Sequence, residues 1–562
     1  MMEASPKTVY DAIVVGSGAS GGWASKLLSE AGLKVAVVDR GRPLPDSEFV
    51  EHKPRFELKY RDMAPEIIAK TRFVQRNSGA CDEYNYEWFC NDIEEPYTTP
   101  PDMPFLWKGR LRVIGGRTVV WGRQSYRLSD LDFKAASFDG YGVDWPLSYK
   151  DLAPYYDQVE EYVGITGMSE GLSQLPDGRF QPPMGLTCAE THLRERVKKN
   201  LGWNITLGRS ANITRGINGR APCHYCGPCQ RGCVTHSYFN SGFTTLADAL
   251  KTGRSTLIPN AYVCKVLMDP ATNRARGVLY VDRQTRALHE VRGKVVILCA
   301  QALESVRVLL NSATREYPDG LANSSGVLGH YLMDHLFGVS VHGELPDFPG
   351  KANVNGPHRP DGIYVVRFRN TLTGGRSKNF LRGYGYQGGG AAHFNYNAYG
   401  FGSAYTKAVM DPVTSIGISG FGECLARRDN YVEIDPNVSD IFGIPVLRIH
   451  MKLSPNETAM AKDIVESGVE MLEAAGARNI RTQPHPKPPG SAIHELGVAR
   501  MGNDPKASVL TPFQQTHDVR NLFVMDGSAF PSSACQNPTL TIMALCVRSC
   551  DRLIREMKRG NV

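Results

Sequence analysis

A glycine-rich turn between an apolar strand and a helical segment constrains the fold of this sequence more than any other feature. Residues 12–15 (AIVV) form a short apolar run of the kind that fills a buried strand in a parallel sheet. The turn follows at residues 16–21 (GSGASG). A helical pattern comes next and ends at Gly32. A second strand, residues 35–38 (VAVV), ends at Asp39, which lies 18 residues beyond the third glycine. The segment therefore predicts a strand–turn–helix–strand unit that binds a dinucleotide.

Each part of this unit has a physical role in holding a pyrophosphate. The glycines permit a tight turn, a close approach of backbone to phosphate, and close packing of helix on strand. The helix N-terminus offers unpaired N–H groups and the positive end of its dipole. Asp39 is placed to accept a hydrogen bond from a ribose hydroxyl. A glycine-rich turn without a ligand is the alternative, and the motif alone leaves FAD and NAD open.

The length and composition of the chain exclude several other classes of protein. With 562 residues it is expected to contain several structural units, and its 42% of hydrophobic residues argues against disorder. The net charge of +7 is spread along the sequence without a basic block, so no nucleic-acid partner is expected. The longest apolar runs fall far short of the roughly 20 residues that span a bilayer, so no transmembrane segment is expected.

The N-terminal residues leave the compartment open. Residues 1–10 contain no apolar core of a signal peptide, so the chain is expected to carry no Sec signal of its own. Export together with a signal-bearing partner would place the protein in the periplasm, and without such a partner it would stay in the cytoplasm.

Four further segments, together with the glycine-rich turn, carry a resemblance to a known family. They are residues 115–122 (GGRTVVWG), 494–502 (HELGVARMG), 526–527 (DG) and 537–541 (NPTLT). On this combination the chain is identified as a member of the glucose–methanol–choline (GMC) oxidoreductase family, over most of its length. Within the family it is most similar to bacterial sugar dehydrogenase large subunits, particularly those that oxidise glucosides at C3, and somewhat less to pyranose oxidases.

The resemblance implies an α/β fold in two parts. One is a doubly wound, Rossmann-like FAD-binding domain, and the other is an α+β substrate domain built on an antiparallel sheet. We expect the FAD-binding domain to comprise residues 8–45, 105–130, 220–340 and 490–562. The substrate domain and its loops would then comprise residues 46–104, 131–219 and 341–489. Within it, residues 345–411 are expected to form long loops that decide the substrate.

The resemblance also implies noncovalent FAD and the residues that hold it. Pyranose oxidases attach their flavin through a histidine in the segment that corresponds to residues 115–121, and the matching residue here is Val120. The expected FAD site consists of Gly16, Ser17, Gly18, Ala19, Ser20, Gly21, Asp39, Arg40, Gly115, Gly116, Trp121, Gly122, Val263, Asp526, Gly527, Pro538 and Thr539.

Hydride removal from an alcohol requires a base for the hydroxyl proton. The family places a histidine at the head of its His-x-x-Gly motif, and a second histidine or an asparagine about 43 residues later; His494 and Asn537 occupy those positions. A histidine can accept the proton near neutral pH, and an amide can bind the same oxygen without competing for it. The alternative for His494 is a histidine that serves packing alone.

A cluster of cysteines predicts a metal centre. Four of the 13 cysteines lie within one 11-residue window, at Cys223, Cys226, Cys229 and Cys233. Their spacing matches the bacterial ferredoxin run, although Val234 replaces the usual proline and no second run is present. The resemblance implies a three-iron (3Fe–4S) rather than a four-iron (4Fe–4S) iron–sulfur cluster held by three of them. Zinc, and plain or disulfide-bonded cysteines, are the alternatives. Three more are expected to be core thiols: Cys535, Cys546 and Cys550.

Together these features predict an FAD-dependent dehydrogenase that oxidises a secondary hydroxyl of a sugar or glycoside, with C3 the expected position. Electrons would pass through the cluster to a quinone or cytochrome, and the need for a small partner subunit stays open. An oxygen-using oxidase without a cluster and an FAD-containing lyase are the alternatives. The candidates for sugar contacts, each with a structural hydrogen-bonding role as its alternative, are Arg123, Gln124, Tyr126 and Gln301.

Overall fold

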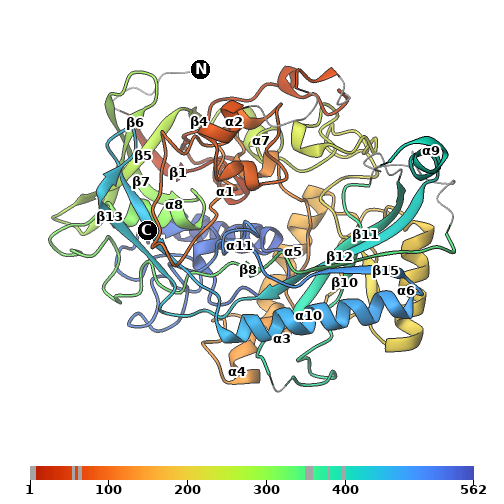
Figure 1. Ribbon diagram of the computed structural model, residues 1–562. Helices are drawn as coiled ribbons and strands as arrows, with labels where there is room; N and C mark the ends of the chain where they lie inside the picture. The colour runs from red at the N-terminus through yellow and green to blue at the C-terminus, as the bar shows by residue number, and fades with distance from the viewer. Residues whose placement is uncertain (1–7, 54–56, 61–65, 349–358, 378, 394–399) are drawn as a thin grey trace.

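The strands on either side of the glycine-rich turn belong to a largely parallel sheet of seven strands. A computed structural model of the protein describes residues 8–53, 57–60, 66–348, 359–377, 379–393 and 400–562 (Figure 1). The parallel strands pair in the order β4 (Ser255–Ile258), β2 (Val35–Val38), β1 (Val9–Val15), β7 (Leu288–Leu298) and β16 (Leu522–Val524). Two antiparallel strands extend the sheet from the first half of β7, namely β6 (Arg274–Asp282) and β5 (Ala261–Asp269).

Helices cover this sheet because its central strands are apolar on both faces. The helix that follows the turn, α1 (Ala19–Glu30), packs against α7 (Thr245–Lys251) and α11 (Thr539–Lys558). The last of these also contacts α5 (Tyr149–Val163), while α8 (Ala302–Leu310) lies against β5. The strand–turn–helix–strand unit expected from the sequence is therefore confirmed as β1, α1 and β2.

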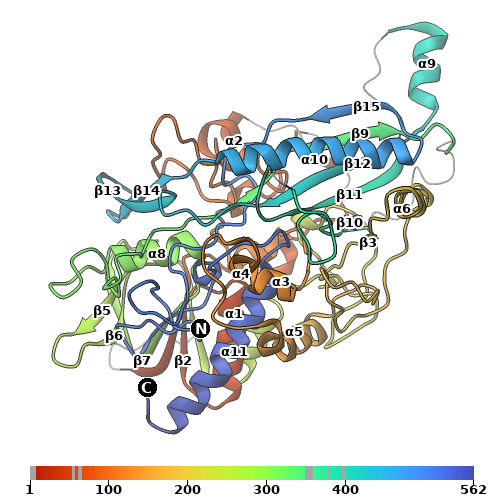
Figure 2. The ribbon, with the colours of Figure 1, turned by 90° about the horizontal axis from the view of Figure 1, so that it is seen from below.

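A second sheet of seven strands is antiparallel throughout and forms the other half of the molecule (Figure 2). Its long helix, α10 (Pro455–Ala474), lies against one face of the sheet, and α6 (Cys188–Leu201) packs beside α10. A separate apolar core fills the space between this sheet and the two helices. The strands pair in the order β15 (Arg478–Gln483), β9 (Ser340–Glu344), β12 (Val413–Glu423), β11 (Tyr384–His393), β10 (Ile363–Val365) and β3 (Ile205–Leu207), with β8 (His335–Leu336) also on β12.

The expectation of long loops between residues 345 and 411 is wrong for much of that segment. It contains β10, the 10-residue strand β11, and the helix α9 (Gly402–Met410). Glycine is used in β11 for close packing: a Cβ added to Gly388 would lie 2.1 Å from the carbonyl oxygen of Gly417 on β12. The same composition that suggested a loop thus lets neighbouring backbones approach. Residues 349–358, 378 and 394–399 of this segment lie outside the described residues.

The helix α5 begins after Ser148, whose side chain forms a reciprocal capping box with Asp151. The remaining α-helices and strands are α2 (Glu66–Thr71), α3 (Asp130–Phe133), α4 (Ala135–Asp139), and the hairpin of β13 (Tyr431–Ser439) and β14 (Pro445–His450).

In the part of the chain that the structure describes, no helix combines the length and the apolar character needed to cross a bilayer.

The predicted fold class is confirmed, since a helix-flanked, largely parallel sheet accompanies a separate antiparallel sheet. The proposed division into domains stays a prediction. The strands of the first sheet come from residues 9–38, 255–298 and 522–524. Those of the second come from residues 205–207, 335–423 and 478–483, so that β8 joins the second sheet although the predicted FAD-binding segment runs to residue 340.

Candidate active site

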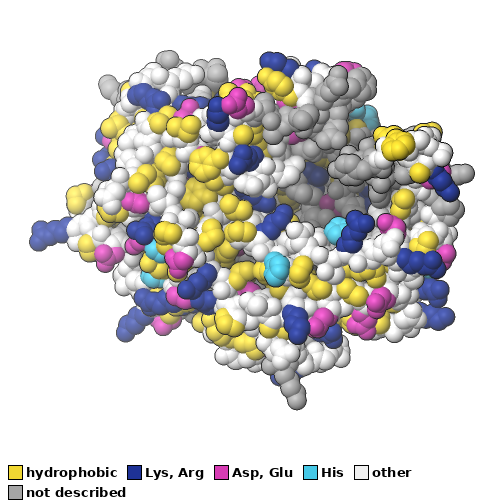
Figure 3. Space-filling model, viewed as in Figure 1, with side chains coloured by type: hydrophobic (Ala, Val, Ile, Leu, Met, Phe, Trp, Pro, Cys, Tyr) yellow, Lys and Arg dark blue, Asp and Glu magenta, His cyan; other side chains and the backbone are white. Residues whose placement is uncertain are grey.

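A cavity of about 650 Å³ reaches from the glycine-rich turn of the first sheet to β11 and β12 of the second. The face of the molecule shown in Figure 3 is hollowed in the part toward α9. Most residues of the expected FAD site line the cavity, together with His494, Asn537, Arg123, Gln124 and Gln301. The residues of the expected FAD site that do so are Gly16, Ser17, Gly18, Ala19, Ser20, Asp39, Arg40, Gly116, Trp121, Gly122, Val263, Asp526, Gly527, Pro538 and Thr539.

The glycine-rich turn leaves space that a ligand can fill. A Cβ added to Gly18 would meet only the carbonyl oxygen of Gly115, at 4.0 Å, and one added to Gly116 only the Cα of Gly18, at 3.7 Å. The helix α1 begins after Gly18 without a side-chain cap, so its first N–H groups have no side-chain acceptor. Open backbone beside an uncapped helix N-terminus fits a pyrophosphate.

The carboxylate of Asp39 ties the turn to the end of β2. Its Oδ2 atom accepts hydrogen bonds from the backbone N–H of Ser17 at 2.6 Å and from the Ser17 hydroxyl at 2.7 Å. Its Oδ1 atom accepts the N–H of Gly41 at 2.6 Å. Asp39 therefore holds the shape of the turn, and its contact with a ribose stays a prediction.

Three predicted site residues lie behind the cavity wall instead of lining it. A Cβ on Gly21 would lie 1.9 Å from the carbonyl oxygen of Gly16, so this glycine allows α1 to pack on β1. Gly115 donates its N–H to the Ser17 hydroxyl at 3.0 Å and holds the turn from behind. Tyr126 is fully buried, and its ring stacks on that of Tyr364 with centroids 4.1 Å apart.

The structure brings His494 and Asn537 together on the cavity wall. The Nε2 atom of His494 lies 3.4 Å from the side-chain Nδ2 of Asn537. Asn537 lies two residues before α11 begins at Thr539. Burial lowers the pKa of His494 well below its ordinary value, and the neighbouring His335 and Arg117 lower it further. The imidazole is therefore neutral at physiological pH, as a proton acceptor must be.

His335 lies behind His494 and was not found from the sequence. The two Nδ1 atoms are 3.1 Å apart, so one ring must carry the hydrogen between them and the other must accept it. Burial lowers the pKa of His335 to about 4, which keeps this ring neutral as well. His335 sits in the two-residue strand β8, where no sequence period marks it.

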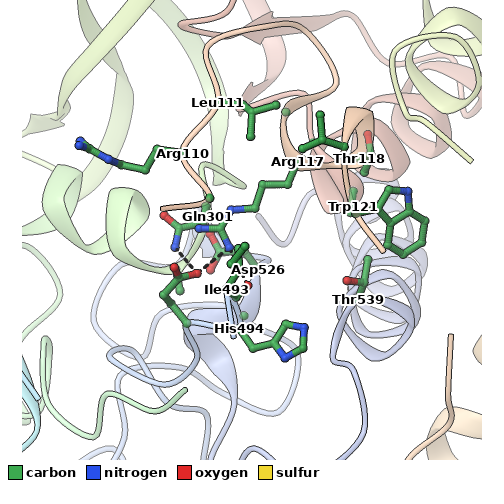
Figure 4. A pocket seen from close by; sticks show the side chains of 18 of the residues that line it. Arg110, Leu111, Arg117, Thr118, Trp121, Gln301, Ile493, His494, Asp526 and Thr539 are labelled. Carbon is green, nitrogen blue, oxygen red and sulfur yellow. Dashed lines mark hydrogen bonds and ion pairs between the residues drawn. The ribbon is translucent and has the colours of Figure 1, made fainter. Parts of the chain in front are cut away.

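Arg117, Gln301 and Glu495 form a second polar group beside His494. In Figure 4, Arg117 and Gln301 converge above Ile493 and His494. Both donate to Oε2 of Glu495, Arg117 at 2.5 Å and Gln301 at 3.3 Å. Arg117 also donates to the carbonyl oxygen of Ile493 at 3.0 Å. Gln301 thus lies at the cavity, with its amide N–H engaged by Glu495.

Two other sugar-contact candidates lie at the cavity with internal partners. Arg123 donates to the carbonyl oxygen of Trp121, and the side-chain oxygen of Gln124 accepts a hydrogen bond from the Tyr126 hydroxyl. Burial raises the pKa of the cavity residue Asp361 to about 6, and the guanidinium of Arg123 opposes that shift. Their contact with a sugar stays a prediction.

The four clustered cysteines lie beside the cavity and do not line it. Burial raises the pKa of the Cys226 thiol to about 11, and the other three cysteines of the run raise it further. Arg123 links this loop to the cavity, since its charge opposes the rise in the pKa of Cys229. Within the described residues, no three His, Cys, Asp or Glu side chains converge as ligands of one metal ion, so the iron–sulfur cluster and its zinc alternative both stay predictions.

The remaining cysteine expectations can be checked directly. No disulfide forms among the described residues, which include all 13 cysteines, so the four cysteines of the run are free thiols in the structure. The three cysteines near the C-terminus are buried, as predicted for core thiols: Cys535, Cys546 and Cys550.

Comparisons with known proteins show the family to which the chain belongs. Family models described as GMC oxidoreductase match residues 10–337 and 426–546. The chain is 29% identical to a 2-methyl-1,2-propanediol dehydrogenase of Mycolicibacterium austroafricanum, over 97% of this chain and 95% of that protein. It is 26% identical to a fructose dehydrogenase large subunit of Gluconobacter japonicus, over 98% of both chains. A C-glycoside 3-oxidase of Arthrobacter globiformis is 28% identical over 54% of this chain and 53% of its own length.

The fold, the glycine-rich turn and the family matches define an FAD-dependent oxidoreductase that acts on CH–OH groups. The chain belongs to the GMC oxidoreductase family, as its sequence predicted.

Proposed function

We propose that this protein is a dehydrogenase that oxidises a secondary hydroxyl of a sugar or glycoside, at C3, to a ketone. The observation that carries the proposal is the pairing of His494 with Asn537 at 3.4 Å on the wall of the cavity. The names of the relatives support the substrate class, because they include a fructose dehydrogenase, a diol dehydrogenase and an oxidase that acts at C3 of a glycoside.

The residues at the cavity fit FAD. Gly18 and Gly116 leave room for a pyrophosphate, and Asp526, Gly527, Pro538 and Thr539 line the far part of the same space. When bound, FAD supplies the acceptor for the hydride that leaves the alcohol carbon.

The chain itself supplies the base and the orientation of the alcohol. The Nε2 atom of His494 takes the hydroxyl proton, while the Nδ2–H of Asn537 donates to the same hydroxyl oxygen. The hydroxyl loses its proton to His494 as the carbon loses its hydride, and a ketone remains. Because the pKa of His494 is depressed, the ring stays ready to accept a proton at neutral pH.

An apolar wall limits the access of water to this pair. The centroid of the Phe421 ring lies 6.1 Å from that of His494, and the centroid of the Phe337 ring lies 5.0 Å from that of Phe421. Both phenylalanines line the cavity. Their flat faces also suit the C–H groups of a sugar ring, in keeping with the proposed substrate.

We further propose that electrons leave through a three-iron cluster held by three cysteines of the 223–233 run, to a quinone or cytochrome. The spacing of the four cysteines within one 11-residue window and the shared buried cluster of Cys229 and Cys233 support this. The fructose dehydrogenase relative is a large subunit, which supports a small partner subunit here. Export with a signal-bearing partner would place the enzyme in the periplasm, and cell fractionation with and without that partner tests this.

Anaerobic flavin reduction tests the central claim. We expect His494→Ala to bind FAD like the wild type and to lose flavin reduction by a glycoside by at least about a thousandfold, within the range attributed to a positioned base. Retained reduction in the variant would contradict the assignment of the base.

An oxidase is the second candidate, because the C-glycoside 3-oxidase relative is named as one. Stoichiometric hydrogen peroxide from air-saturated enzyme, without iron in the protein, would favour it over the dehydrogenase.

A further inference from the structure

Gln387 connects the antiparallel sheet to the proposed catalytic pair. It lies in β11, where it pairs with Tyr364 of β10 and Ser419 of β12, and its side chain lines the cavity. Its Nε2–H donates to the Oδ1 atom of Asn537. The amide that faces the base is thus held by a strand from the opposite half of the molecule.

This hydrogen bond matters because the two ends of an asparagine amide have opposite chemistry. The Oδ1 atom accepts hydrogen bonds and the Nδ2 atom only donates them. With Oδ1 turned to Gln387, Nδ2 faces the Nε2 atom of His494 at 3.4 Å. If the amide were reversed, its oxygen would face Nε2 and would favour a proton on that nitrogen.

The direction of donation continues through the histidines. A donor at Nδ2 of Asn537 requires Nε2 of His494 to be the acceptor, which leaves the ring hydrogen on Nδ1. That hydrogen is donated to Nδ1 of His335, 3.1 Å away. His335 accepts it as a neutral ring, because burial lowers its pKa to about 4. Each residue in the series Gln387, Asn537, His494 and His335 then donates a hydrogen bond to the next one.

We propose that Gln387 is a positioning residue that fixes the orientation of the Asn537 amide, and thereby keeps Nε2 of His494 free as the proton acceptor. The inference rests on the proposed base role of His494. It adds that the protonation state of the base depends on a residue 107 positions earlier in the chain that need not touch the base.

The variant Gln387→Glu tests this inference because a carboxylate can only accept. The Asn537 amide must then turn its Nδ2 toward position 387 and its oxygen toward His494. We expect the acid limb of kcat/KM to move up by about one pH unit or more, and kcat at pH 7 to fall about tenfold or more, with FAD retained. Gln387→Met, whose side chain has no donor, should lower kcat but move the acid limb less than Gln387→Glu does. Gln483→Glu, on exposed strand β15 of the same sheet, should leave the profile unchanged.

A second set of variants separates the effect of the Asn537 amide orientation from the effect of the new negative charge. The new carboxylate would also raise the pKa of His494 directly, so Gln387→Glu is repeated in an Asn537→Ala background. If the orientation of the Asn537 amide causes the shift, the shift of the acid limb is at least halved in the Asn537→Ala background. An undiminished shift, or no shift in the single variant, overturns the positioning role. Failure of the proposed function is a different result, because His494→Ala would then still reduce flavin.

Discussion

The carboxylate of Asp334 holds the backbone of His494 in place: its Oδ1 atom accepts the His494 N–H at 3.0 Å. Its Oδ2 atom accepts the N–H groups of Gly490 at 2.7 Å and Ala492 at 3.2 Å. The loop that carries the base is thus attached at three points to one buried side chain next to His335. Burial and the nearby Glu495 raise the pKa of Asp334 to about 6, despite these hydrogen bonds.

Replacing Asp334 should loosen this loop. In Asp334→Asn one acceptor oxygen becomes an amide donor that faces N–H groups, which leaves at least one buried N–H unpaired. We expect the free energy of unfolding at pH 7 to fall by about 1–3 kcal/mol, and flavin reduction to slow about tenfold while FAD stays bound. Thermal unfolding and stopped-flow reduction measure the two effects. The exposed Asp102→Asn is the control, and a wild-type reduction rate in Asp334→Asn would contradict the role.

The same carboxyl group should leave a signature in stability against pH. Its pKa is about 6 in the folded protein, above its ordinary value of 3.8, so the folded state binds more protons than the unfolded state between these values. Its contribution to the free energy of unfolding therefore falls as pH rises from about 4 to about 6, by on the order of 3 kcal/mol. Denaturant unfolding of wild type and Asp334→Asn across this range should show their difference changing in that direction. A difference that stays constant with pH would contradict the raised pKa.

The depressed pKa of His494 predicts where activity is lost in acid. Because burial, His335 and Arg117 all disfavour the charged ring, Nε2 stays unprotonated down to a pH well below 6.5. We expect kcat/KM to be independent of this group above pH 6.5 and to fall only below it. Measuring anaerobic flavin reduction from pH 4.5 to 9 checks this, with FAD content followed in parallel. An acid limb centred at or above pH 6.5 would contradict the neutral buried base.

Two glycines of the same turn should respond to alanine in different ways. The Cβ of Gly18→Ala would enter the cavity, so this variant should fold and bind FAD at least about tenfold more weakly. The Cβ of Gly21→Ala would lie 1.9 Å from the carbonyl oxygen of Gly16, so α1 cannot keep its place on β1 and the variant should fail to fold. Circular dichroism and fluorescence titration of the apoprotein with FAD separate the two outcomes. Equal FAD affinity in wild type and Gly18→Ala would show that no phosphate approaches this residue.

The parts of this molecule that the sequence predicted are local in the chain. The unit from β1 to β2 spans residues 9–38, and its period and glycines are visible in one short stretch. The pair of His494 and Asn537 was found from a family resemblance, since 43 residues separate them and no period relates them.

The residues that the sequence did not reveal act across long distances in the chain. His335 meets His494 across 159 residues, and Gln387 meets Asn537 across 150. Each comes from a strand of the antiparallel sheet, whose packing against the other half no local pattern encodes. Tyr126 shows the converse: it is close in sequence to the cavity residue Gln124, yet its ring packs against Tyr364 behind the wall.

The iron content of the protein decides whether the cysteine run is a redox centre. Burial raises the pKa of Cys223, Cys226 and Cys229, so these thiols are poorly placed as free thiolates, whereas binding of an iron–sulfur cluster would stabilise them in that form. We expect about three irons and matching acid-labile sulfide per FAD after anaerobic purification.

Serine at each position of the run then identifies the ligands, since three of the four variants should lose iron and keep FAD. They are Cys223→Ser, Cys226→Ser, Cys229→Ser and Cys233→Ser, with the exposed Cys188→Ser as the control that keeps both. Flavin reduction by substrate should survive in the iron-free variants, while electron transfer to a quinone or cytochrome should fail, because the cluster acts after the flavin. Protein that contains FAD without iron, and still reduces a quinone, would remove the cluster from the electron path.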